Sequence, residues 1–139
     1  GSGKVGLGLA TGFGLSKGAL AASVAHDSHN LIVVGADDGD MHAALKAVVD
    51  LGGGFAAVVD GQVEATVPLP IGGLMSNAPM ETVRGQLDAI IRVAHDLGSP
   101  LADPFMALGF IALPVIPKLK ITDHGLVDVE RFEVVPLFC

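Results

Sequence analysis

The sequence predicts a single α/β domain over residues 1–139, of the α+β kind, in which mixed or antiparallel β-sheets with hairpins are flanked by two main helices. Three observations support this fold class. Short apolar runs are bounded by glycine and aspartate, which is typical of strands. Two longer segments repeat apolar residues at helical spacing. Asp60-Gly61 stands between two strand runs, and both residues can take the positive φ of a tight hairpin turn.

The first half of the chain contains three predicted strands and one helix. Residues 5–9 alternate Val or Leu with Gly, which predicts a strand with one bare face that another backbone can approach. Residues 19–25 and 31–34 are further strand runs. Asp37 begins a segment with the i, i+3, i+4, i+7 apolar spacing of a core-facing helix, which ends at Gly52.

The second half repeats this plan loosely. After the hairpin of residues 55–59 and 62–67, a helix with one apolar stripe is expected, capped by Ser76 or Asn77 and stopped by Gly98. The remaining predictions are a buried strand at residues 103–113, a hairpin joining residues 118–122 to 126–129, and a final strand at residues 132–138. Both helices close with Asp-Leu-Gly and a hairpin follows each, which suggests two similar halves.

Composition narrows the class of protein. The only aromatics are six Phe, so the core must be aliphatic. The formal charge of −7 argues against nucleic acid and anionic membranes as partners, because both require a basic face. No uninterrupted apolar run reaches the roughly 18 residues of a membrane span. The single cysteine, Cys139, cannot form an internal disulfide, and with no secretory signal we expect a cytoplasmic protein. The absence of an initiator Met suggests a fragment of a longer protein.

A polar segment interrupts the apolar pattern of the first half. It consists of His26, Asp27, Ser28, His29 and Asn30. Polar groups next to buried strands are costly unless each finds a partner. The segment is therefore either a turn whose side chains bond the nearby backbone, or part of a site completed by something outside this chain.

Two chemical interpretations of this segment are weak. His26 and His29 would share a face only on a helix, whereas the setting is strand and turn, and a zinc site requires three or four ligands. A triad of Ser28, His29 and Asp27 would need convergent geometry that adjacent residues rarely achieve. We therefore predict no metal site and no catalytic residue in this chain.

A second unusual segment is the loop at residues 68–77, which is too apolar to be freely solvated. It either packs on the core or docks against another domain or subunit. The interface candidates in it are Ile71, Leu74, Met75 and Ser76.

In several segments the sequence resembles the C-terminal domain of bacterial-type adenine deaminases. The similar segments, in order, are Val5–Gly8 with Gly12–Leu15, Val24–Gly35, Pro68–Ile71 with Gly73–Ser76, Asp103–Met106, Ala112–Pro117 and Gly125–Val129. They run nearly from end to end, and the combination is much more specific than any one of them.

The resemblance implies a larger, amidohydrolase-related enzyme that converts adenine and water to hypoxanthine and ammonia in purine salvage. Its metal-binding (β/α) barrel, which needs about 250 residues, would hold a Mn or Fe pair that activates the water. Such barrels typically supply a His-x-His, which these 139 residues lack. The resemblance therefore implies an accessory domain without a cofactor of its own, whose partners are the barrel, the substrate adenine and other subunits of a homo-oligomer.

Within this accessory domain we expect His26 to Asn30 to lie near the substrate and Ile71 to Ser76 to form an interface. Three alternatives stay open. The chain is a stand-alone module that binds a small molecule without chemistry, or it is purely a structural or oligomerisation module. The third alternative is autonomous catalysis, which is the weakest of the three because the sequence lacks a set of metal ligands.

Overall fold

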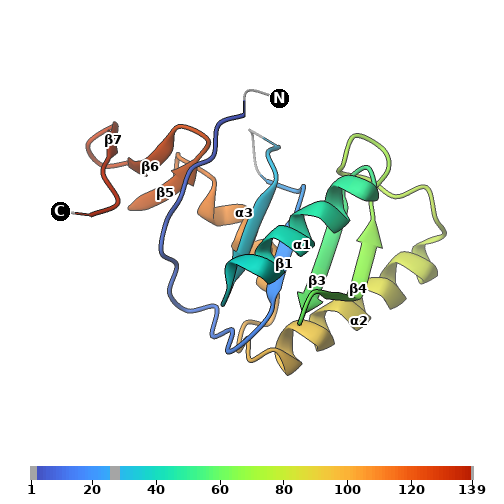
Figure 1. Ribbon diagram of the computed structural model, residues 1–139. Coiled ribbons are helices and arrows are strands. Elements are labelled where there is room, and N and C mark those ends of the chain that lie inside the picture. The colour runs from blue at the N-terminus through green and yellow to red at the C-terminus, as the bar shows by residue number, and fades with distance from the viewer. Residues whose placement is uncertain (1–2, 26–28, 139) are drawn as a thin grey trace.

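The computed structural model describes residues 3–25 and 29–138 and forms a three-layer α/β/α domain with a small second sheet beside it (Figure 1). The elements follow in the order β1 (Ala19–Ala22), β2 (Ile32–Gly35), α1 (Asp38–Asp50), β3 (Gly54–Val59), β4 (Gln62–Pro68), α2 (Met80–Asp96), α3 (Pro104–Ile111), β5 (Leu119–Thr122), β6 (Gly125–Asp128) and β7 (Glu133–Val135). The predicted fold class, with antiparallel sheets, hairpins and flanking helices, is confirmed.

The central sheet has the strand order β2-β1-β3-β4, and every neighbouring pair is antiparallel. Helix α1 covers one face, and helices α2 and α3 cover the other. Side chains along β1 alternate between the two cores, since Ala19 and Ala21 pack with α1 while Leu20 and Ala22 face α2 and α3. The small alanines allow α1 to pack closely on the sheet.

Helix α1 and the β3–β4 hairpin form as predicted and are joined by a carboxylate. Asp37 caps the helix by accepting a hydrogen bond from Asp40 N at 2.9 Å. The buried carboxylate of Asp40 accepts from Asp60 N at 3.1 Å and from Gly61 N at 2.7 Å. Asp60 and Gly61 both have positive φ, as the hairpin prediction required.

Helix α2 is confirmed, but its predicted start is wrong. The N-cap residue is Pro79, and no side chain caps the helix. Ser76 Oγ instead accepts from Ala78 N at 3.2 Å, so this hydroxyl closes a turn before the helix begins.

The predicted buried strand at residues 103–113 is wrong, because this segment forms helix α3. Asp103 accepts from Met106 N at 2.9 Å and Pro104 occupies the first turn, which together start a helix. A run that is apolar at every position has no period to separate a strand from a helix. The pair Asp103-Pro104 was the signal in the sequence that a helix begins at this point.

The second sheet, β5-β6-β7, contains the predicted hairpin around residues 123–124 and a last strand shorter than predicted. Both main helices end at the Asp-Leu-Gly positions, with C-caps Leu51 and Leu97. The halves nevertheless differ, since α3 intervenes after α2 and the later hairpin belongs to a separate sheet.

The predicted strand at residues 5–9 is also wrong, because these residues pair with no strand of the described chain. The expected close approach does occur. A Cβ on Gly6 would lie 1.7 Å from Thr122 O, and a Cβ on Gly8 would lie 2.5 Å from Ile121 Cδ1. The segment lies on the β5–β6 hairpin instead of pairing within a sheet.

A membrane-spanning helix was not expected, and none of the helices in residues 3–25 and 29–138 has the length and apolar character to cross a bilayer.

Candidate functional site

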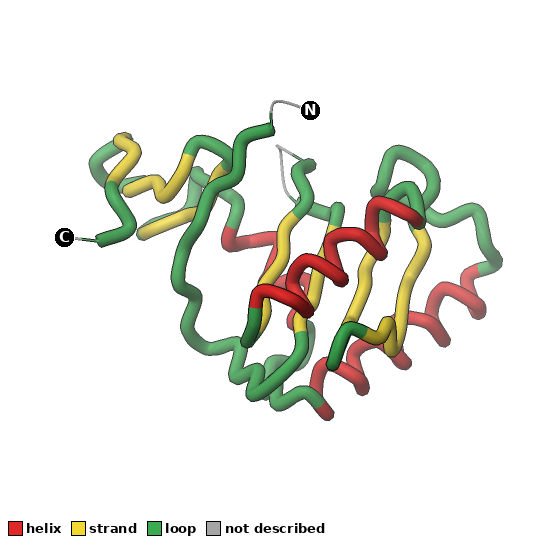
Figure 2. Tube along the Cα trace, viewed as in Figure 1, coloured by secondary structure: helices red, strands yellow, loops and turns green. Residues whose placement is uncertain are grey.

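Both segments singled out from the sequence leave the central sheet at the same edge, which we call the loop edge. In the antiparallel register the end of β1 (Ala22) lies beside the beginnings of β2 (Ile32) and β3 (Phe55). Residue Phe55 in turn pairs with Val67 near the end of β4. The loop edge therefore carries residues 23–25 and 29–31, residues 51–53 and residues 69–79, which appear as the green segments along the upper end of the sheet in Figure 2.

Ser23 connects these loops through a buried hydroxyl. Its side chain donates to Gly73 O at 2.6 Å and accepts from Gly54 N at 2.8 Å. Its backbone N–H donates to Gly54 O at 3.0 Å. Since a hydroxyl offers one donor and two acceptor sites, this geometry satisfies the donor and one acceptor without water. The first loop after β1 is thereby joined to the apolar loop 50 residues later.

Two glycines make this contact possible. A Cβ on Gly53 would lie 2.3 Å from Gly73 Cα, and both residues have positive φ. The backbone of the apolar loop also bonds directly here, since Leu69 N donates to Gly53 O at 3.0 Å. The apolar loop is therefore held against the loop edge by its backbone and by the buried side chain of Leu69.

The polar segment is only partly described. His26, Asp27 and Ser28 lie outside the described residues. His29 and Asn30 are exposed at the loop edge, and His29 N donates to Ala25 O at 3.0 Å. His29 has a φ of 47°. This left-handed conformation costs a non-glycine residue about 1–3 kcal/mol and often occurs at functional sites.

The apolar loop buries Leu69 in the core but presents three other large side chains to solvent. Ile71 and Met75 bond each other's backbone, with N to O distances of 3.1 Å and 3.2 Å, which closes a tight turn. Ile71, Leu74 and Met75 are all exposed, and Met75 keeps 59% of its surface accessible. Ser76 is half-buried and closes the next turn.

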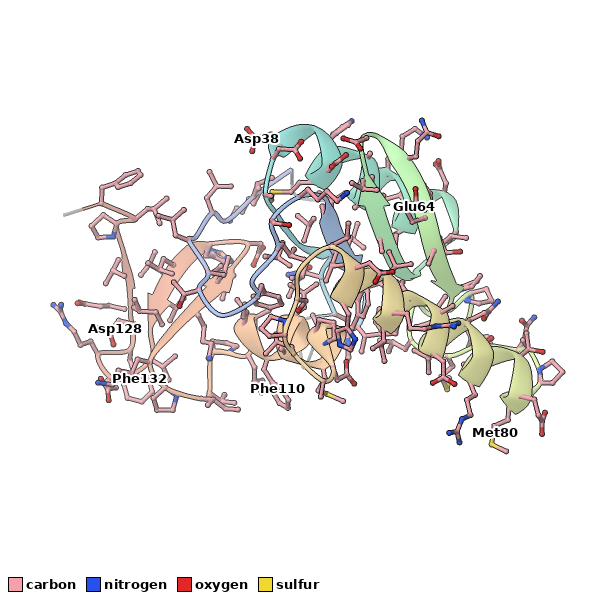
Figure 3. All side chains as sticks on the ribbon, turned by 90° about the horizontal axis from the view of Figure 1, so that it is seen from below. Asp38, Glu64, Met80, Phe110, Asp128 and Phe132 are labelled. Carbon is pink, nitrogen blue, oxygen red and sulfur yellow. The ribbon has the colours of Figure 1, made fainter. Side chains whose placement is uncertain are left out.

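An apolar groove of about 630 Å³ runs between this loop and α2. Met75, Met80 and Leu87 line it, and Met80 projects from the beginning of α2 (Figure 3). A second groove of about 260 Å³ lies between α2 and α3 and includes Val24 and Phe55. Because Leu87 and Ile91 line both grooves, the apolar surface continues across α2.

The side chains of the described residues do not fit a metal pair. Within residues 3–25 and 29–138, no three His, Cys, Asp or Glu side chains gather in a way that could hold a metal ion. His42 lies on α1 and His124 in the β5–β6 turn, while His95 Nε2 makes a hydrogen bond to Leu101 O at 2.8 Å.

The fold is that of an α/β domain with a small second sheet. Residues 1–133 match the family described as "Adenine deaminase C-terminal domain", and the chain belongs to this family. The resemblance noted in the sequence motifs is confirmed.

Several relatives are named adenine deaminase, and they are much longer than this chain. The chain is 63% identical over 138 residues to the adenine deaminase of Desulfatibacillum aliphaticivorans, and the match covers 99% of this chain but 24% of that relative. It is 54% identical over 137 residues to the adenine deaminase of Methanothrix thermoacetophila, with 99% and 24% covered. The protein from Dehalococcoides mccartyi is 53% identical over 135 residues, with 97% and 24% covered. The chain therefore spans about a quarter of the length of these relatives.

Sequence reasoning identified both loops but missed the serine that joins them. The available signal was a hydroxyl inside the otherwise apolar run of residues 19–25. Its partner, Gly73, is far away in the sequence, so no local pattern could pair them.

Replacing Ser23 should destabilise the domain. Ser23→Ala removes a buried hydroxyl with two short bonds and leaves Gly54 N and Gly73 O without that partner, which should lower the free energy of unfolding by about 1–3 kcal/mol. Urea unfolding followed by circular dichroism measures this change.

Ser99→Ala is the matched control. Ser99 is equally buried, but its Oγ has no hydrogen-bond partner among the described residues, so its loss should leave stability unchanged or slightly higher. Equal losses in the two variants would contradict a specific role for the Ser23 hydroxyl.

Proposed function

We propose that this chain is the C-terminal accessory domain of a cytoplasmic adenine deaminase that hydrolyses adenine to hypoxanthine and ammonia in purine salvage. The observation that carries this proposal is the coverage, since nearly all of this chain matches about a quarter of the relatives named adenine deaminase. The rest of those proteins has room for a (β/α) barrel of about 250 residues. On this proposal the chain does not catalyse the reaction alone.

The reaction replaces the exocyclic amine of the purine with oxygen from water. A Mn or Fe pair, held by the preceding part of the enzyme, supplies an activated water when bound. The role left to this domain is to bind, orient and enclose the purine substrate. A purine edge presents donors and acceptors side by side, and His and Asn side chains can match both.

We place the loop edge of this domain at the wall of the substrate pocket. His29 and Asn30 are exposed there, and His29 has the left-handed backbone conformation often found at functional sites. The Ser23 hydroxyl supports this arrangement by holding the loops in one position relative to the sheet. A rigid pocket wall contributes to turnover, because small displacements of the groups that position the substrate lower the reaction rate strongly.

The apolar loop and the groove beside α2 support a role in domain or subunit contacts. Ile71, Leu74 and Met75 are exposed together, and the groove continues from them along α2. Apolar surface of this kind is stabilised by burial against another protein surface. We propose that it packs on the barrel or on a second subunit of a homo-oligomer.

The central test compares this chain alone with a chimera in which it replaces the C-terminal quarter of the Desulfatibacillum aliphaticivorans adenine deaminase. With Mn(II) and adenine, we expect ammonia release from the chimera and none from the isolated chain, because the described residues form no metal-holding group. Ammonia release and bound metal are measured on the same samples. Turnover with bound metal in the isolated chain would overturn the accessory role.

The pocket role predicts a kinetic defect without a stability defect. In the chimera, His29→Ala should lower kcat/KM by roughly tenfold or more, since one lost hydrogen bond in a transition state is worth about 1.4 kcal/mol. His26→Ala should act in the same way.

His42→Ala on α1 is the matched control, because this histidine is exposed and lies on a helix away from the loop edge. It should leave kcat/KM unchanged, and thermal unfolding should show similar stability for all three variants. Unchanged kinetics in both His26→Ala and His29→Ala would contradict the pocket role.

The interface role predicts weaker assembly when charge enters the apolar loop. Met75→Glu or Leu74→Glu should loosen domain or subunit association in the chimera, because a carboxylate buried in an apolar contact is strongly unfavourable. Analytical ultracentrifugation and limited proteolysis between the domains measure the change.

Val63→Glu provides the control for this experiment. Val63 is similarly exposed on β4, next to the hairpin turn at the opposite end of the sheet from the loop edge. Assembly unaffected by both Met75→Glu and Leu74→Glu would count against the interface role.

A further inference from the structure

A second apolar surface lies on the segment that precedes β1. It consists of Val5, Leu7 and Leu9, which we call the apolar strip. Their exposed fractions are 79%, 66% and 82%. The strip follows the β5–β6 hairpin, along which the blue segment descends from the N-terminal end in Figure 1.

The intervening glycines determine which way the strip faces. Gly6 lies on the backbone of Thr122, so a Cβ at this position would collide with a carbonyl oxygen, and Gly8 lies on the Ile121 side chain, which would have to move to admit a Cβ. The strip residues alternate with these glycines and therefore project away from the hairpin. Gly6 and Gly8 therefore contact the hairpin on one side of the segment, and the three branched aliphatic side chains are exposed on the other side.

This pattern is unusual for a surface that faces water. A segment with one buried side and one solvated side normally carries polar residues on the solvated side. Here all three outward positions are aliphatic, and removing each of these side chains from water would be favourable. The strip therefore has the composition of a surface covered by another apolar surface.

The family description and the length of the relatives are the grounds for choosing one partner for the apolar strip. The chain belongs to a family described as a C-terminal domain, and its relatives extend over about four times its length. In such a protein the preceding polypeptide joins this domain beside the strip. A surface next to a covalent junction meets its neighbour at high effective concentration, which favours a contact with the preceding domain over one with a separate molecule.

We propose that Val5, Leu7 and Leu9 dock on an apolar surface of the polypeptide that precedes this domain in the longer enzyme. The proposal rests on the proposed function in assigning the chain to a longer adenine deaminase. It adds an anchoring contact that is distinct from the loop edge. The glycine side seats the segment on the β5–β6 hairpin, and the apolar side fixes this unit to the preceding domain.

Thiol labelling tests this contact directly. A Leu7→Cys variant is prepared in a Cys139→Ser background, both as the isolated chain and in the chimera with the Desulfatibacillum aliphaticivorans enzyme. Maleimide labelling of the peptide that contains position 7 is followed by mass spectrometry. We expect labelling to be at least about tenfold slower in the chimera, because the docked side chain is shielded from the reagent. A tenfold rate ratio corresponds to about 1.4 kcal/mol of protection. Val63→Cys is the control and should label equally in both.

A second substitution shows whether the strip itself provides the protection. Adding Leu9→Glu to the chimera should restore rapid labelling at position 7, since a buried carboxylate disfavours the docked state. Adding Val63→Glu instead should leave the labelling slow. Equal labelling at position 7 in the chimera and the isolated chain would overturn the proposal.

The remaining outcomes separate this inference from the proposed function. Slow labelling in a chimera that releases no ammonia would support the docking contact and count against the assigned activity. Slow labelling in the isolated chain that accelerates on dilution would overturn the proposal, because a second copy would then cover the strip.

Discussion

The arrangement of the loop edge depends on one buried hydroxyl. Ser23 bonds the beginning of β3 through Gly54 N and the apolar loop through Gly73 O. Without this bridge the apolar loop would keep fewer contacts with the sheet, since Gly53 and Gly73 have no side chains to pack. The backbone contact that they allow brings Gly73 within reach of the serine. The loops are thus held by backbone atoms and by the Ser23 hydroxyl, while exposed side chains such as that of Met75 remain available for partners.

The central sheet explains why the candidate site lies at an edge. Both faces of the sheet are covered, by α1 on one side and by α2 and α3 on the other. Its middle strands carry small apolar residues such as Ala21 and Ala57, which are fully buried between the layers. The loops at the strand ends and the grooves beside α2 carry the exposed side chains of the candidate site.

The described chain exposes several apolar surfaces. The apolar loop, the groove beside α2 and the apolar strip all present aliphatic or thioether side chains to solvent. The described residues form no group that could hold a metal ion. The chain spans about a quarter of the length of its relatives, and the packing roles proposed for these surfaces rest on that coverage.

Local patterns in the sequence determined most of the secondary structure. Asp60-Gly61 predicted its hairpin, Asp37 predicted the start of α1, and the motifs predicted the family, because each depends on neighbouring residues alone. Tertiary structure decided the rest. The fully apolar run of α3 has no period to distinguish helix from strand, and whether residues 5–9 join a sheet depends on partners far along the chain. The Ser23–Gly73 bond joins positions 50 residues apart. Only packing brings such groups together, which is why the sequence revealed the two loops of the candidate site and the structure revealed that they meet.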